Sequence, residues 1–136
     1  MPAIFPSKDW LNELDARLNS DEQYRNIARR WEGDLFIVIE ADGNLKESFT
    51  LYLDLWHGSC RKAEYKPERA SHPNPAFVLT ASYNAIAAIL SGKLNPMTAM
   101  LTGKLNVKGS MGYMMRNFRT VFDFVRVAQS ATTEIL

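Results

Sequence analysis

The sequence predicts an α+β protein in which helices cover a five-stranded sheet. Three observations support this fold class. The chain has 136 residues, 46% of them hydrophobic, which suits one domain with its own core. Period-two alternation, typical of strands, runs through the middle of the chain, whereas helical spacing of apolar residues marks both flanks. No linker or shift of composition divides residues 1–136, so we expect a single domain.

Residues 7–32 have the pattern of two amphipathic helices. Ser7 is a good N-cap, because its hydroxyl can accept a free backbone N–H. Ser20 is the expected start of the second helix, with Gln23 in the capping-box position. In the first helix, apolar residues recur on one face at Trp10, Leu11, Leu14 and Leu18.

Residues 33–109 hold the expected sheet. The strands are predicted at residues 35–39, 46–57, 60–65, 77–80 and 104–108. Short turns join the first three, which predicts an antiparallel meander. The proline-rich residues 66–75 form a loop in which His72 is expected at the surface. Ser82 and Asn95 are expected to cap two short helices before the last strand.

A single helix is expected over residues 110–128, beginning at Ser110. Its apolar side chains recur on one wide face.

Composition limits the function classes. A formal charge of +1 argues against nucleic acid as a partner. The one cysteine cannot form an internal disulfide, and no signal-peptide pattern or bilayer-length apolar run occurs. We therefore expect a cytoplasmic protein. Metal-ligand spacing, phosphate-binding glycine motifs and a serine-nucleophile elbow are all lacking, so we expect neither a metal nor a cofactor.

One group of residues could support catalysis. Asp54, His57 and Cys60 lie close together around a predicted hairpin turn. A cysteine nucleophile needs a base within hydrogen-bond reach, but alternation along the strand points Asp54 and His57 to opposite faces. The favoured interpretation is an ordinary strand end, and a thiol enzyme ranks last among the alternatives.

Methionine is concentrated late in the chain, at Met97, Met100, Met111, Met114 and Met115. Its flexible, polarizable side chain fills irregular cores and also lines sites that accept varied apolar shapes. A methionine-rich core and a ligand cavity are both open interpretations. Nearby basic residues would suit an anionic membrane surface or simply a solvated helix face: Lys104, Lys108, Arg116, Arg119 and Arg126.

Two motifs in this region resemble those of a known family. Gly92-Lys93-Leu94-Asn95-Pro96 is followed, after a short predicted helix, by Gly103-Lys104-Leu105 and a strand that ends in Gly109-Ser110-Met111. This pattern resembles the sterol carrier protein-2 family of lipid-transfer domains, over roughly residues 76–115. The resemblance implies a largely antiparallel sheet of five strands and helices that enclose an apolar tunnel.

The resemblance and the apolar pattern together predict the function. We expect non-catalytic binding or transfer of a hydrophobic lipid, such as a fatty acid, an acyl-CoA, a sterol-like molecule or a quinone, with transient contact to a membrane surface. The alternative is an accessory subunit or homodimer that docks a lipid-metabolising enzyme through an apolar helical surface. The expected lipid-binding residues are Ile86, Leu90, Met97, Met100, Leu101, Leu105, Val107, Met111, Met114, Met115, Phe118 and Phe122.

Overall fold

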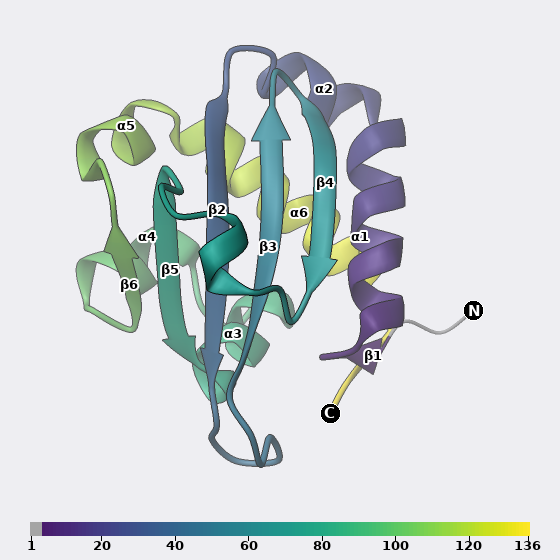
Figure 1. Cartoon of the computed structure of the whole chain (residues 1–136), viewed down its shortest axis with the longest axis vertical. Coiled ribbons are helices and arrows are strands. Elements are labelled where there is room, and N and C mark those ends of the chain that lie inside the picture. Colours follow the sequence, from purple (N-terminus) through teal and green to yellow (C-terminus); the bar gives the residue numbers. More distant parts are fainter. Residues whose placement is uncertain (1–3) are drawn as a thin grey trace.

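The computed structural model describes residues 4–136 and contains a five-stranded sheet in the order β4-β3-β2-β5-β6 (Figure 1). The strands are β2 (Glu32–Glu40), β3 (Phe49–Trp56), β4 (Ser59–Tyr65), β5 (Phe77–Ser82) and β6 (Leu105–Lys108). β2, β3 and β4 form the predicted antiparallel meander, and β5 and β6 are also antiparallel. Within this sheet, β2 and β5 pair in parallel. The predicted fold class is confirmed.

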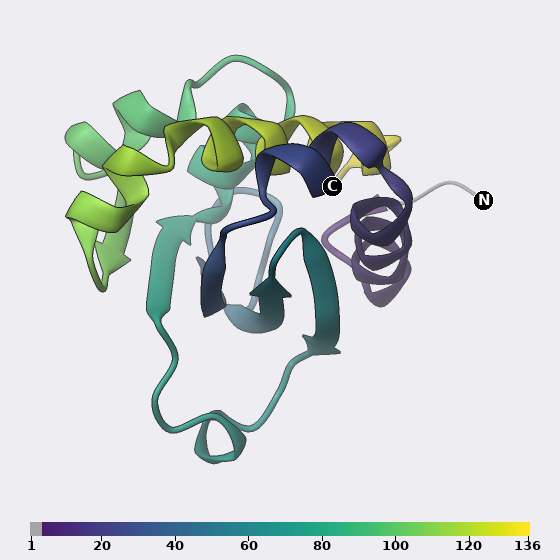
Figure 2. The ribbon, with the colours of Figure 1, turned by 90° about the horizontal axis from the view of Figure 1, so that it is seen from above.

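The parallel pairing decides which face of the sheet is free. After β4 the chain must cross the sheet to reach the far side of β2, and it does so as residues 66–76, which include the short 3-10 helix η1 (Arg69–Ser71). This crossover passes over one face, called here the outer face (Figure 2). The opposite, inner face is covered by helices, so any interior cavity lies on that side.

The helices begin largely where the sequence predicts. They are α1 (Lys8–Ser20), α2 (Glu22–Ile27), α3 (Tyr83–Leu90), α4 (Pro96–Leu101), α5 (Met111–Arg116) and α6 (Phe118–Ala131). Side chains of Ser7, Ser82, Asn95 and Ser110 accept the expected N-cap hydrogen bonds. The second cap was predicted one residue early, because it is the carboxylate of Asp21 that accepts the backbone N–H of Tyr24, at 2.9 Å.

The expected single helix over residues 110–128 is wrong, since α5 and α6 are separate helices. Asn117 between them has a non-helical backbone conformation (φ −112°, ψ 34°). Its side-chain amide donates to the carbonyl oxygen of Tyr113 at 2.8 Å, and such a local bond competes with helix continuation. The break turns α6 so that its apolar side packs on the inner face of the sheet.

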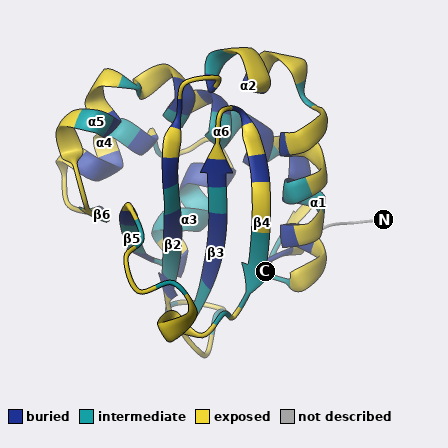
Figure 3. Ribbon diagram, turned by 45° about the horizontal axis from the view of Figure 1, so that its top comes forward, coloured by how far each residue is buried: buried dark blue, intermediate teal, exposed yellow. Residues whose placement is uncertain are grey.

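The core lies between the inner face and the helices. Figure 3 shows buried residues along β2 and β3 and largely exposed residues along α5. Beyond the sheet, β1 (Ile4–Phe5) and β7 (Glu134–Ile135) pair in parallel and bring the two ends of the described chain together. Within residues 4–136, no helix combines the length and apolar character needed to cross a bilayer.

Gly109 should tolerate no side chain. Its φ is +134°, and a Cβ built there would lie 2.5 Å from the carbonyl oxygen of Ala76. We predict that Gly109→Ala lowers the free energy of unfolding by about 3 kcal/mol or more, because backbone strain and steric overlap add. Gly92→Ala is the matched control: its φ is +81° but nothing lies within 4 Å, so about 1 kcal/mol is expected. Denaturant unfolding measures both, and equal losses would contradict the prediction.

Candidate functional site

The structure separates the residues that could have formed a thiol active site. Cys60 is buried, and its thiol donates to the carbonyl oxygen of Lys62 at 3.4 Å. His57 instead lies 2.6 Å from the carboxylate of Glu32, and Asp54 accepts two hydrogen bonds from Arg61. Burial raises the pKa of the Cys60 thiol, which disfavours the nucleophilic thiolate.

The described residues do not form a candidate metal site either. In residues 4–136, no three His, Cys, Asp or Glu side chains gather where they could hold a metal ion.

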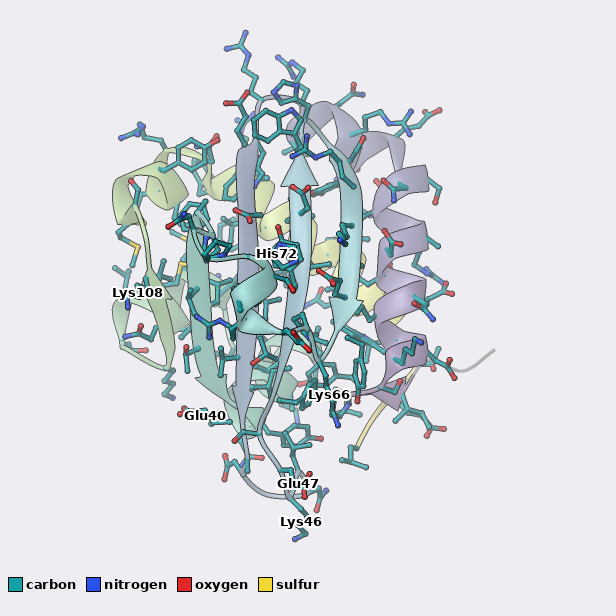
Figure 4. All side chains as sticks on the ribbon, in the orientation of Figure 1. Glu40, Lys46, Glu47, Lys66, His72 and Lys108 are labelled. Carbon is teal, nitrogen blue, oxygen red and sulfur yellow. The ribbon has the colours of Figure 1, made fainter. Side chains whose placement is uncertain are left out.

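An aromatic and polar cluster packs the crossover onto the outer face of the sheet, beside an open polar hollow of about 430 Å³ lined in part by Asp34, Tyr52 and Asp54. The ring of His72, labelled in Figure 4, stacks on Tyr52 with centroids 3.6 Å apart and also bonds to Glu64. Arg69 lies over the ring of Phe36, 4.5 Å from its centroid. The expectation of a surface histidine is therefore wrong, because His72 fixes the crossover to the sheet and only 15% of its side chain is exposed.

The inner face contains an apolar pocket of about 100 Å³, called here the first pocket. It lies between the sheet and α3, α4 and α6. Its lining residues are Phe5, Trp10, Ile37, Ile39, Leu51, Leu79, Ile86, Ile89, Leu90, Pro96, Met100, Leu105, Val121, Phe124, Val125 and Ala128. The one polar group among these side chains, the Trp10 indole N–H, donates to Thr132 at 2.7 Å. The pocket can therefore accept apolar surface but offers no group for chemistry.

A smaller second pocket, of about 50 Å³, adjoins the first. Its lining residues are Tyr24, Trp31, Leu35, Leu55, Leu79, Met100, Met114, Thr120, Val121 and Phe124. Four side chains line both pockets and form the wall between them: Leu79, Met100, Val121 and Phe124. The two spaces therefore lie next to each other on the inner face.

The residues predicted to bind lipid fall into three groups. Ile86, Leu90, Met100 and Leu105 line the first pocket, and Met114 lines the second. Met97 and Val107 are half-buried and pack against the core. The remainder are exposed, namely Leu101, Met111, Met115, Phe118 and Phe122.

Sequence reasoning missed much of the pocket lining. Ile37, Ile39 and Leu51 were recognised as apolar strand residues, but nothing in their pattern distinguishes a pocket wall from a filled core. Phe124 and Val121 carried a usable signal, since they lie one helical turn apart and face the same side once α6 is separated from α5.

A polar clamp positions α6 over these pockets. The carboxylate of Asp123, which is only 5% exposed, accepts hydrogen bonds from Gln23 of α2 at 2.7 Å and from Arg126 at 2.9 Å. Arg126 also bonds to Asp21 at 2.7 Å, and this hydrogen bond lowers the pKa of Asp21. The clamp ties one side of α6 to α2 and leaves its apolar side toward the pockets.

Cys60 provides a direct test against a thiol enzyme. We predict that a thiol reagent at mildly alkaline pH modifies Cys60 at least about a hundredfold more slowly in the folded protein than in denaturant, because the thiol is buried and stays protonated. The rate of thiol modification is followed by absorbance. Rapid modification of the native protein would revive the nucleophile hypothesis.

Comparisons with known proteins find solved structures with the same fold. A crystal structure of sterol carrier protein 2 has 29% sequence identity and a TM-score of 0.79, and the match covers 90% of this chain and 95% of that chain. The solution structure of a conserved hypothetical protein from Thermus thermophilus, described as possibly a sterol carrier protein, has 28% identity and a TM-score of 0.80, with coverage of 93% and 88%. A comparison with curated proteins gave no significant match.

The same fold also occurs inside a larger enzyme. An inverting sec-alkylsulfatase from Pseudomonas has 18% identity and a TM-score of 0.54, and the match covers 89% of this chain but only 16% of that chain. The family model described as the SCP-2 sterol transfer family matches residues 11–123. Domains of this kind bind and transfer lipids and generally lack catalytic activity of their own. Because the family model spans most of the sequence, the chain belongs to the SCP-2 sterol transfer family.

Proposed function

We propose that this protein binds a hydrophobic lipid in the joined first and second pockets and transfers it without chemical change, in the reducing cytoplasm. The observation that carries the proposal is the apolar first pocket between the inner face and α6. Removing lipid surface from water into such a pocket is worth about 25 cal/mol per Å². Fatty acyl chains, sterol-like molecules and quinones all offer such surface.

Binding requires the interior to open. The first pocket, at about 100 Å³, is smaller than the roughly 300 Å³ at which sites for small-molecule ligands begin. We therefore propose that this arrangement is a closed form, and that a lipid is admitted only when side chains or helices separate. The flexible side chain of Met100 lines both pockets and suits this role.

The short helix α5 is the proposed lid. It is bounded by Ser110 and Asn117, and Met114 is its one buried residue, placed against the second pocket. Outward movement of α5 would withdraw Met114 and open that pocket. In this proposal, Ile86, Leu90, Met100, Leu105 and Met114 touch the lipid. The remaining predicted residues surround its path: Met97, Leu101, Val107, Met111, Met115, Phe118 and Phe122.

Filling the wall between the pockets should block binding. We predict that Val121→Phe weakens binding of a fluorescent fatty acid by about tenfold or more, because the larger ring occupies the space through which the pockets would join. Fluorescence titration measures the affinity. Val38→Phe is the matched control, since Val38 lies between inward-facing neighbours on β2 and so faces outward. Equal affinity of the Val121 variant and the wild type would refute binding in these pockets.

The exposed apolar residues suggest how the lid meets a membrane. Met111 and Met115 are one turn apart on α5, and Phe118 and Phe122 are one turn apart on α6 with ring centroids 6.2 Å apart. Basic residues, among them Arg116, lie in the same two helices. Apolar side chains flanked by cations suit the surface of an anionic bilayer. Contact there would place the lid at the source of the lipid.

A double variant tests this contact. We predict that Phe118→Ser with Phe122→Ser weakens binding to vesicles containing phosphatidylserine by about tenfold or more, because two large apolar side chains are lost. Co-sedimentation measures the affinity of the protein for the vesicles. Trp56→Ser, at another exposed aromatic residue, should bind like the wild type.

The alternative function, an accessory or homodimeric subunit, predicts a different outcome. It rests on the same exposed residues of α5 and α6, which could pack against protein instead of lipid. If the wild type does not bind vesicles and its mass in size-exclusion chromatography falls from dimer to monomer in the double variant, the alternative replaces the membrane contact.

A further inference from the structure

Helix α5 contacts the rest of the molecule through few side chains. Met114 is buried and Tyr113 is half-buried, whereas the other four residues of the helix are exposed: Met111, Gly112, Met115 and Arg116. A helix of six residues is not stable through its own hydrogen bonds and needs contacts with its surroundings. The position of α5 over the second pocket therefore depends on Met114 and Tyr113.

Tyr113 forms a hydrogen bond to the start of the sheet. The pairing between β2 and β5 begins at Leu35, so Glu32, the first residue of β2, has no partner on β5. The backbone N–H of Glu32 donates instead to the hydroxyl oxygen of Tyr113, at 2.9 Å. This hydrogen bond is exposed, so water can replace each partner when they separate and the net cost of breaking it is small. It is thus a contact that α5 can make and break.

The ring of Tyr113 connects α5 to the wall of the second pocket. It packs edge-to-face on Trp31, with centroids 5.1 Å apart, and lies 6.1 Å from the ring of Phe77. Trp31 lines the second pocket, and its indole N–H donates to the carbonyl oxygen of Gly33 at 3.0 Å, which fixes the ring to β2. Tyr113 is not itself among the lining residues. It can therefore hold α5 in place without contacting a lipid in the pocket.

We propose that Tyr113 is the latch of the lid: its hydrogen bond to Glu32 and its ring contact with Trp31 hold α5 closed, and a lipid enters or leaves the second pocket when both separate. Ser110 and Asn117, at the two ends of α5, have non-helical backbone conformations and can absorb the movement. This inference rests on the proposed lipid-binding function and on α5 as its lid. Because the latch closes the lid with or without lipid, Tyr113 is a positioning residue that sets the rates of exchange rather than the affinity.

The test is Tyr113→Phe, which removes the hydrogen bond and keeps the ring. We expect the association and dissociation rates of a fluorescent fatty acid, measured by stopped-flow fluorescence, each to rise about three- to tenfold, the loss of one hydrogen bond. Their ratio, the dissociation constant, should stay within about twofold of the wild type. In the lipid-free protein, hydrogen exchange of the Glu32 amide should accelerate by a similar factor.

Tyr52→Phe is the matched control, since Tyr52 lies on the outer face and its hydroxyl donates to Asp34 at 2.7 Å. It also loses a hydrogen bond, yet its exchange rates should equal those of the wild type. Unchanged rates in Tyr113→Phe would overturn the inference. So would equally raised rates in both variants, which would indicate general loosening, or a weaker affinity with an unchanged association rate. If the wild type does not bind the fatty acid, the proposed function itself fails.

Discussion

The interior of this protein depends on where α6 is held. The helix is fixed along one side by the buried carboxylate of Asp123, which Gln23 and Arg126 pair through hydrogen bonds. Because a buried charge must keep its partners, this contact fixes the distance between α6 and α2. The apolar side of α6 then meets the sheet at whatever spacing the clamp allows, and the two pockets are the space left unfilled. A helix held only by apolar contacts could settle onto the sheet and close that space.

The two faces of the sheet serve different purposes for a topological reason. Parallel pairing of β2 with β5 forces the chain across the outer face, where His72, Tyr52 and Arg69 pack it in place. The inner face is thereby left to the long helix α6 and to shorter helices that each begin at a capping side chain, α3, α4 and α5. Helices α4 and α5 have six residues each, so they gain little stability from their own hydrogen bonds and rely on packing.

Much of the fold could be predicted because it is encoded locally. Helix starts at Ser7, Ser82, Asn95 and Ser110 follow from single capping side chains, and the strands follow from alternation. The break at Asn117 was missed because the apolar spacing continues through it, while the side-chain bond to Tyr113 that ends α5 leaves no pattern. The pockets could be expected only in outline. Met100 lines a pocket whereas Met111 is exposed, and this difference depends on neighbours that are distant in the sequence.

The pairing of β1 with β7 has a consequence for larger architectures. Both ends of the described chain emerge together at the opposite end of the molecule from α5 (Figure 1). Further polypeptide fused at either terminus would thus start at the end of the molecule remote from α5. The sec-alkylsulfatase, in which this fold makes up only part of a longer chain, shows that the fold accommodates additional polypeptide.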